Sequence, residues 1–271
     1  MEWIYGKTVV ITGASSGIGR ALTCKLIKEH SCRVIGIGQS EGKMKSLIDE
    51  LGYQHDAFRY KIFDVSSQEE WNDFARELLE SKIQVDLLIN NAGMMPEFDK
   101  AIHYPEQEVE RCFAVNFHAV RYGIRAMLPV LQNSTTPGIV NISSAAALVS
   151  LTGTGIYGAT KAALKAYTES LIGELGREMY IGYVCPGFVR TDILRNQRVK
   201  TKRGIIRFMS TSPERMAKKI IRKIVRQKSR MILGKDAHFM NFTSKFFPVL
   251  GLKLYESILK GSKDEMFENI R

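Results

Sequence analysis

A tyrosine and a lysine stand one helical turn apart in the second half of the chain. Tyr157 and Lys161 are four residues apart, so on a helix their side chains lie on one face. An ammonium beside a phenol favours the phenolate, and we therefore expect Lys161 to lower the pKa of Tyr157 from about 10 toward working pH. Such a tyrosine can give a proton to a carbonyl oxygen or take one from an alcohol. Taken alone, the same spacing is more often an exposed helix face.

A glycine-rich turn follows the first apolar run of the chain. The run Thr8–Ile11 precedes Thr12-Gly13-Ala14-Ser15-Ser16-Gly17-Ile18-Gly19, and a helical pattern comes next. Glycines permit a tight turn and a close approach of backbone to ligand, while a helix N-terminus offers free N–H groups and a positive dipole end. A flexible turn is the alternative, but the position after the first strand favours a pyrophosphate site.

The elements that must position these residues alternate along the chain. Short apolar runs predict strands at Thr8–Ile11, Arg33–Ile37, Ala57–Phe63, Val85–Ile89, Gly138–Ile142, Ile181–Cys185 and Met231–Leu233. Amphipathic runs predict helices at Gly17–Glu29, Lys43–Leu51, Gln68–Glu80, Glu106–Leu131, Gly155–Gly176 and Pro213–Gln227. This alternation indicates an α/β fold with one doubly wound parallel sheet of about seven strands and helices on both faces.

No repeat or linker divides the chain, so we expect one domain over residues 1–271. Residues 188–211 interrupt the alternation and are typical of a substrate loop. That loop ends at Ser212-Pro213, an N-cap followed by an N1 proline. Residues 236–271 predict a C-terminal helical extension.

Six motifs in order resemble those of the short-chain dehydrogenase/reductase family. They are Thr12–Gly19, Asp64-Val65, Asn90-Asn91-Ala92-Gly93, Asn116, Ser143-Ser144 with Tyr157–Lys161, and Pro186-Gly187-Phe188-Val189-Arg190-Thr191. The resemblance covers roughly residues 5 to 235. It implies a Rossmann-like fold and an NAD(P)-dependent enzyme that interconverts CH–OH and C=O groups.

The resemblance assigns four catalytic positions. Tyr157 is the implied acid/base, and Lys161 also binds the nicotinamide ribose. Ser144, thirteen residues before Tyr157, matches the serine that bonds the reacting oxygen, and this spacing excludes Ser143. Asn116 is either a satisfied core amide or, as the family implies, the residue behind Lys161 that holds a proton-relaying water.

The same motifs assign the cofactor site, and no metal is expected. The implied cofactor-binding residues are Gly13, Ser15, Ser16, Gly17, Ile18, Gly19, Gln39, Ser40, Asp64, Val65, Asn91, Ala92, Gly93, Tyr157, Lys161, Pro186, Gly187, Val189 and Thr191.

The end of the second predicted strand favours NADP(H) over NAD(H). Gly38 stands where NAD-preferring relatives carry an acid, so no carboxylate there repels a 2′-phosphate. Gln39 stands where NADP-preferring relatives often carry arginine, but Gln39, Ser40 and Lys43 can still donate to a phosphate. Glu41 opposes this preference.

Apolar residues are expected to line the substrate pocket. They are Met94, Met95, Pro96, the run Ala145–Leu151, and Phe188. They favour a hydrophobic ketone or secondary alcohol and a hydroxysteroid-dehydrogenase-like enzyme. A 3-oxoacyl carrier-protein or acyl-CoA reductase remains an alternative, as does a non-catalytic NAD(P)-binding sensor.

The net charge of +11 is concentrated in one segment, since residues 195–235 hold 15 of the 39 Lys and Arg with one acid, Glu214. The four cysteines form no Cys-x-x-Cys pair, which favours reduced thiols in the cytoplasm. No segment has the length and apolarity of a signal peptide or spanning helix.

An apolar run after the last strand is interleaved with Lys245, Lys253 and Lys260. It predicts a helical cap or an oligomer contact, or alternatively a peripheral membrane contact. The family resemblance implies a homodimer or homotetramer through the helices that carry Asn116 and Tyr157. No nucleic-acid recognition module accompanies the basic segment, so nucleic acid is not an expected partner.

Overall fold

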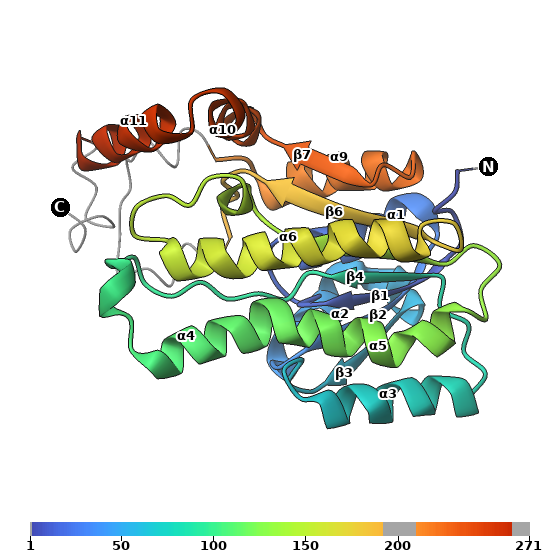
Figure 1. The fold of residues 1–271 in the computed structure, drawn as a ribbon. Helices are drawn as coiled ribbons and strands as arrows, with labels where there is room; N and C mark the ends of the chain where they lie inside the picture. Colours follow the sequence, from blue (N-terminus) through green and yellow to red (C-terminus); the bar gives the residue numbers. More distant parts are fainter. Residues whose placement is uncertain (1, 192–209, 262–271) are drawn as a thin grey trace.

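The computed structural model describes residues 2–191 and 210–261 (Figure 1). Its centre is a seven-stranded parallel sheet in the order β3-β2-β1-β4-β5-β6-β7. The strands are β1 (Thr8–Thr12), β2 (Arg33–Gly38), β3 (Phe58–Ile62), β4 (Leu87–Asn90), β5 (Gly138–Ile142), β6 (Tyr180–Pro186) and β7 (Arg230–Leu233). The doubly wound α/β fold predicted from the alternation is therefore confirmed, and each strand begins and ends within two residues of its predicted bounds.

The helices lie on both faces of this sheet (Figure 1). They are α1 (Gly17–His30), α2 (Glu41–Leu51), α3 (Gln68–Glu80), α4 (Glu106–Phe113), α5 (Ala119–Leu131), α6 (Gly155–Leu175) and α9 (Pro213–Val225). One core cluster joins α1, α2 and α9 to the sheet, and a second joins α3, α5 and α6 to its other face. The pleat explains the division, because Val9 and Ile11 enter the first cluster and Val10 enters the second.

The strand order places a crevice at one end of the sheet. From β1 the chain winds outward to β2 and β3, and it then returns to β4 on the other side of β1. The connections after β1 and β4 therefore diverge at the carboxyl ends of neighbouring strands. In open α/β sheets this switch point is where ligands bind.

The predicted helix at 106–131 is interrupted. A π-helical turn, η3 (Ala114–His118), separates α4 from α5, and Asn116 lies in its middle. The wider turn is stabilised by tertiary bonds, because the Asn116 amide bonds to the backbone of Met94 after β4. Hydrophobic periodicity alone cannot distinguish a single π turn from continuous α-helix.

Two helices follow β7 and form the predicted C-terminal extension. They are α10 (Lys235–Phe246) and α11 (Pro248–Gly261), which lie together beyond the β6–β7 side of the sheet (Figure 1). The N-cap predicted for α9 is present, because Ser212 Oγ accepts from Arg215 N at 3.3 Å and Pro213 occupies the first turn. Of the predicted substrate loop 188–211, residues 192–209 lie outside the described residues. Among the helices that the structure describes, none combines the length and the apolarity needed to cross a bilayer.

Candidate active site

A cavity of about 620 Å³ opens at the carboxyl ends of the central strands. Segments from five of the six motifs reach it, including the turn after β1, the residues after β4 and β5, and the start of the β6–α9 connection, whereas Asn116 does not line it. It is lined by every residue predicted to bind cofactor except Gly19, and by Ser144 among the catalytic candidates. The sequence therefore brings its separate motifs to a single site.

Gly19 does not line the cavity, and its contact with the cofactor stays a prediction. A Cβ built on Gly19 would overlap the carbonyl group of Gly13 and the side-chain amide of Asn91. Gly19 is buried in α1, directly behind the turn. Its lack of a side chain lets the helix pack closely against the turn, which is a different role from contact with a ligand.

The turn after β1 has the backbone of a phosphate site. Gly13 and Gly17 have φ of +65° and +51°, a left-handed conformation that glycine adopts without strain. The N-cap of α1, Ser16, makes no side-chain capping bond, so the first N–H groups of this helix are directed to the cavity end without a side-chain acceptor. A dinucleotide pyrophosphate fits this geometry.

The Asn90–Gly93 motif holds this turn in place. Thr12 Oγ1 accepts from the backbone N–H groups of Asn91 and Ala92, each at 2.9 Å. The side-chain amide of Asn91 donates to Thr12 O at 3.0 Å. The two strand ends on either side of the crevice are thus joined by three hydrogen bonds.

Lys161 and Tyr157 lie on one face of α6, as their spacing predicts. Lys161 is 4% exposed, and its Nζ lies 5.8 Å from the centroid of the Tyr157 ring. Among the described residues the ammonium has one hydrogen-bond acceptor, Ile142 O at 3.1 Å. Since an ammonium has three donors, two can serve hydroxyl groups such as those of a ribose.

The predicted effect of Lys161 on the pKa of Tyr157 is wrong for this structure. Burial raises the pKa of Tyr157 to about 12, and a hydrogen bond with Ser144 opposes this rise only in part. Burial likewise lowers the pKa of Lys161 to about 8. Desolvation dominates both pKa values because both groups are enclosed, and the ammonium lies against the Tyr157 ring and the Ile142 carbonyl. At neutral pH Tyr157 therefore carries its proton and Lys161 its charge.

The two neighbouring serines have different partners. Ser144 bonds the Tyr157 hydroxyl, and its Oγ also accepts from Ala146 N at 3.1 Å. Ser143 is buried and donates to Lys161 O at 2.8 Å, which ties the end of β5 to α6. The spacing favours Ser144 over Ser143 as the catalytic serine, and that assignment stays a prediction, with Ser144 the one of the two that bonds the Tyr157 hydroxyl.

Asn116 is fully buried and all of its polar atoms are bonded. Its Nδ2 donates to Met94 O at 2.9 Å and to Thr160 Oγ1 at 3.0 Å, while Oδ1 accepts from Met94 N at 2.9 Å. A Cβ built on Gly93 would lie 3.1 Å from Asn116 Oδ1 and 3.2 Å from Lys161 Nζ. Asn116 and Lys161 thus approach the same glycine from two helices, and the amide fixes the segment that follows β4.

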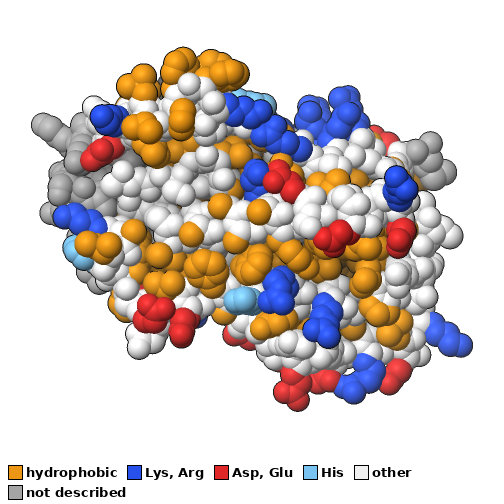
Figure 2. All heavy atoms as spheres, viewed as in Figure 1, with side chains coloured by type: hydrophobic (Ala, Val, Ile, Leu, Met, Phe, Trp, Pro, Cys, Tyr) orange, Lys and Arg blue, Asp and Glu red, His pale blue; other side chains and the backbone are white. Residues whose placement is uncertain are grey.

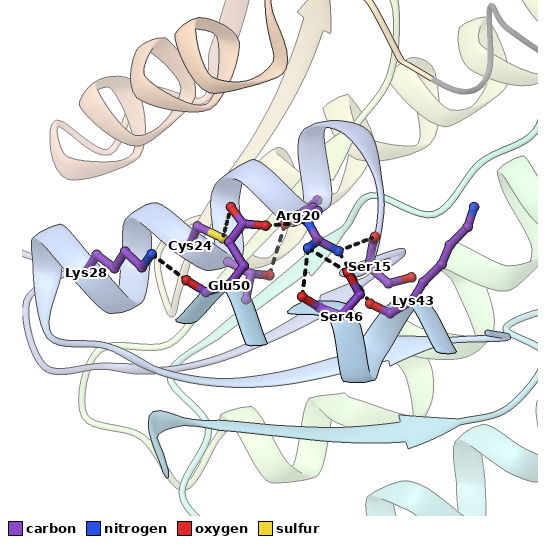
Figure 3. Close-up of polar contacts among 9 residues, drawn as sticks. Ser15, Arg20, Cys24, Lys28, Lys43, Ser46 and Glu50 are labelled. Carbon is purple, nitrogen blue, oxygen red and sulfur yellow. Dashed lines mark hydrogen bonds and ion pairs between the residues drawn. The ribbon is translucent and has the colours of Figure 1, made fainter. Parts of the chain in front are cut away.

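Around the second strand, a polar cluster borders the cavity (Figure 3). Arg20 donates to Glu50 Oε2 at 2.7 Å and to Ser46 O at 3.0 Å, so its guanidinium is committed to α2. Gln39, Ser40 and Lys43 line the cavity, and Figure 3 shows the Lys43 side chain extending away from the Arg20 cluster. Of the three cations labelled in Figure 3, Arg20, Lys28 and Lys43, Lys43 is the one that lines this cavity.

The apolar end of the cavity matches the predicted pocket in part. Met94, Met95, Ala145, Ala146, Leu151 and Phe188 line it, whereas Pro96 and residues 147–150 do not. Phe98 and Met240 complete this wall and were missed, because nothing in the local sequence brings α10 or the segment before α4 to β5. Arg111 at the end of α4 was also missed, and it is the exposed cation of this region.

Asp236 is a further residue that sequence reasoning missed. This buried carboxylate in the first turn of α10 accepts from Phe188 N at 2.5 Å and lines the cavity. A Cβ on either Gly187 or Gly234 would overlap it. Asp236 therefore anchors the C-terminal helices to the segment after β6, and Gly187 together with Gly234, whose φ is +121°, makes room for it. The two glycines, Gly187 and Gly234, are the sequence signal for this carboxylate, but only the folded structure shows that they lie on either side of it.

Comparisons with known proteins agree with this geometry. A family model described as "short chain dehydrogenase" matches residues 7–202. A benzil reductase ((S)-benzoin forming) of Saccharomyces cerevisiae is 33% identical over 202 residues, 71% of this chain and 75% of its own length. The structure of a short-chain dehydrogenase/reductase from Burkholderia phymatum in complex with NAD is 27% identical, with a TM-score of 0.80 over 93% of this chain and 97% of that one. A short-chain dehydrogenase from Burkholderia cenocepacia in complex with NADP shares the fold at 20% identity, with a TM-score of 0.78 over 94% and 99% of the two chains.

Proposed function

The chain belongs to the short-chain dehydrogenase family and is an NAD(P)-dependent oxidoreductase, and we propose that it transfers a hydride between NADP(H) and an apolar ketone or secondary alcohol, in the manner of a hydroxysteroid dehydrogenase. The observation that carries this proposal is the position of Tyr157. It lies in one cavity between the glycine turn and an apolar wall that includes Met95, Leu151 and Phe188.

The proposed proton transfer follows from the states of the side chains. A bound nicotinamide supplies the hydride in reduction and accepts it in oxidation. Because burial raises the pKa of Tyr157 to about 12, its hydroxyl holds a proton at neutral pH and can give it to the carbonyl oxygen as the C–H bond forms. Ser144, which bonds the Tyr157 hydroxyl, would orient the carbonyl oxygen of the substrate. Lys161 would hold the nicotinamide ribose through its two remaining N–H donors.

The protonation state of Tyr157 sets how each reaction direction should depend on pH. A phenol that keeps its proton is ready to act as an acid, whereas oxidation of an alcohol requires the phenolate. In the oxidation direction activity should therefore rise steeply with pH. Measuring the rates of reduction and of oxidation as a function of pH tests this expectation.

NADP(H) is the proposed cofactor, with NAD(H) as the alternative. Gly38 contributes no carboxylate at the end of β2, and Lys43 supplies a positive charge beside Gln39 and Ser40 in the cavity wall. Both features favour an adenosine 2′-phosphate. Arg20 is excluded from this role by its bonds to Glu50 and Ser46.

A 3-oxoacyl carrier-protein or acyl-CoA reductase is the second candidate. Arg111 at the cavity favours it, because an exposed guanidinium there could meet the phosphate of a carrier arm. Turnover of free apolar ketones without turnover of an acyl thioester would exclude this candidate. The third candidate, a non-catalytic NAD(P)-binding sensor, would bind cofactor and reduce nothing.

We further propose a homodimer or homotetramer formed through α5 and α6. Half-buried apolar side chains, among them Tyr122, Tyr167 and Ile172, lie on these helices, and Figure 2 shows hydrophobic side chains along this face. Covering them would remove an apolar surface from water. Sedimentation as a monomer at micromolar concentration would contradict this proposal.

The proposed cellular setting and domain structure follow the sequence predictions. All four cysteines are free thiols in the structure, three of them buried, as suits a reducing cytoplasm. One domain over residues 1–271 remains our proposal, with the C-terminal helices attached to it through Asp236. The peripheral membrane contact expected as an alternative depends on those helices.

One experiment tests the proposed function directly. A panel of apolar ketones, diketones and secondary alcohols, together with one acyl-CoA thioester, is assayed with NADPH and NADH. We expect NADPH oxidation with free ketones and a higher kcat/KM for NADPH than for NADH. Absence of turnover despite cofactor binding would favour the sensor.

A further inference from the structure

Exposed apolar side chains are concentrated on the C-terminal helices. Of the fourteen large hydrophobic side chains exposed in the described part of the chain, nine lie between residues 239 and 258. They are Phe239, Phe242, Phe246, Phe247, Val249, Leu250, Leu252, Leu254 and Ile258. We call these nine side chains the C-terminal apolar surface, and Figure 2 shows hydrophobic side chains gathered over α10 and α11. A contiguous apolar patch of this kind is unusual on a protein surface that faces water.

The helices that carry this surface are firmly held. On its inner side α10 packs Ala237 and Met240 into the core cluster behind the substrate cavity. The two helices also contact each other, since Thr243 Oγ1 and Tyr255 Oη lie 2.7 Å apart and a Cβ on Gly251 would lie 3.1 Å from Thr243 Cβ. The two helices are thus packed against each other and against the core, and the C-terminal apolar surface lies on the side that faces away from these contacts.

The helix pair also carries exposed positive charge. Lys235, Lys245 and Lys253 are exposed on these two helices. The acids of the same stretch are Asp236, which is buried, and Glu256, which has an interaction partner. Aromatic and aliphatic side chains flanked by lysines match the boundary of an anionic bilayer, where the rings enter the acyl region and the ammonium groups meet lipid phosphates.

We propose that the C-terminal apolar surface docks on an anionic lipid bilayer. A second copy of the chain fits this surface less well, because a symmetric contact would bring the same lysines of two strongly basic chains together. Aromatic contacts support the bilayer, since Phe242 packs against Phe246 with ring centroids 4.9 Å apart and both remain more than half exposed. Such a pair forms a compact wedge that a bilayer can cover.

The position of α10 gives this docking a consequence. Met240 lines the cavity, while Phe239, its neighbour in the chain, belongs to the outer apolar surface. Docking would therefore place the apolar end of the cavity within one helix diameter, about 10 Å, of the lipid. Docking itself does not rest on the proposed reaction, and it is tested by binding alone.

The test is sedimentation of the full chain with lipid vesicles. Vesicles of phosphatidylcholine with phosphatidylglycerol are compared with vesicles of phosphatidylcholine alone, at low and high salt. We expect binding to the anionic vesicles that weakens with salt. The double variant F242S/F246S should weaken binding at least about tenfold, since two large apolar side chains no longer enter the lipid. K245Q/K253Q should weaken it by about tenfold or more through lost phosphate contacts.

Two matched controls identify the surface. Y53S/I102S removes two large side chains that are 91% and 87% exposed elsewhere, and it should bind as the wild type does. K218Q/K219Q removes two exposed lysines of α9, and it should weaken binding less than K245Q/K253Q. These positions lie outside the cavity lining, so NADPH binding should be unchanged in all four variants and reports intact folding.

A second measurement is independent of the sedimentation. The emission of an introduced Trp in F246W should shift to shorter wavelength with anionic vesicles. The proposal is overturned if the wild type stays in solution with both vesicle types, or if F242S/F246S binds as tightly as the wild type. It is also overturned if F242S/F246S converts an oligomer into a monomer, which would assign the surface to a second copy.

Discussion

Replacing Lys161 with methionine should make the free chain more stable at neutral pH while abolishing its activity. Burial lowers the pKa of Lys161 from 10.5 to about 8. Each pKa unit corresponds to 1.36 kcal/mol, so holding the buried ammonium charged costs about 3 kcal/mol of folding free energy. Loss of the bond to Ile142 O offsets about 1 kcal/mol of the gain. The expected net stabilisation by K161M at pH 7 is about 2 kcal/mol.

The stabilisation by K161M is lost as pH rises through a defined window. Because the pKa of Lys161 is lower in the folded chain than in the unfolded chain, the unfolded chain binds more protons between about pH 8 and pH 10.5. The free energy of unfolding of the wild type therefore rises with pH through this range, as the buried Lys161 loses its proton. Below pH 8 the full cost of burying the charged ammonium remains. The advantage of K161M should accordingly disappear by about pH 10.5.

Urea unfolding of the wild type and K161M at pH 7 and pH 10 measures this difference directly. K165M is the matched control, because Lys165 lies one turn further along α6 and pairs with Glu169 at 2.8 Å near the surface. It should change stability by less than about 1 kcal/mol at either pH. The reasoning is refuted if K161M is less stable than the wild type at pH 7, or if its advantage is the same at both pH values.

Two further predictions concern Asp236 and Gly38. D236A should lower the free energy of unfolding by about 1–3 kcal/mol, because it leaves the Phe188 N–H without its acceptor. It should also raise the KM for the cofactor. D236N retains an acceptor oxygen and should recover part of the lost stability and part of the KM in the same unfolding and kinetic assays. A D236A variant with wild-type stability and KM would show that this bond is dispensable. G38D should lower the ratio of kcat/KM for NADPH to that for NADH by about tenfold through repulsion of the 2′-phosphate. G38A adds the same Cβ, 2.7 Å from the movable Met44 Cε, without the charge, so an equal loss in G38A would contradict the electrostatic cause.

Much of the fold could be predicted because its signals are local. Alternating apolar strands and amphipathic helices indicate the parallel sheet, and Ser212-Pro213 marks the start of α9. The π turn around Asn116 could not be predicted, because it is stabilised by bonds to Met94, twenty-two residues earlier in the chain. Periodicity describes a helix by itself, whereas this turn is set by its tertiary partner.

The candidate site was predicted as a set of residues more accurately than as a chemical environment. Motif order placed Ser144, Tyr157 and Lys161 at one cavity, but their spacing carries no information about burial. For that reason the pKa of Tyr157 was predicted to fall, whereas desolvation raises it. Asp236 and Met240 were missed because only the packing of α10 brings them to the cavity.

The central claim is that Tyr157 delivers the proton during hydride transfer, and Y157F tests it most directly. NADPH oxidation by the wild type and by Y157F is measured with an apolar ketone that the wild type reduces, and NADPH binding is followed separately by fluorescence. We expect kcat to fall by about a hundredfold or more, while the dissociation constant of NADPH changes little, because the phenylalanine keeps the ring but has no proton to give. A Y157F variant that binds NADPH and retains a kcat within a few-fold of the wild type would contradict the account.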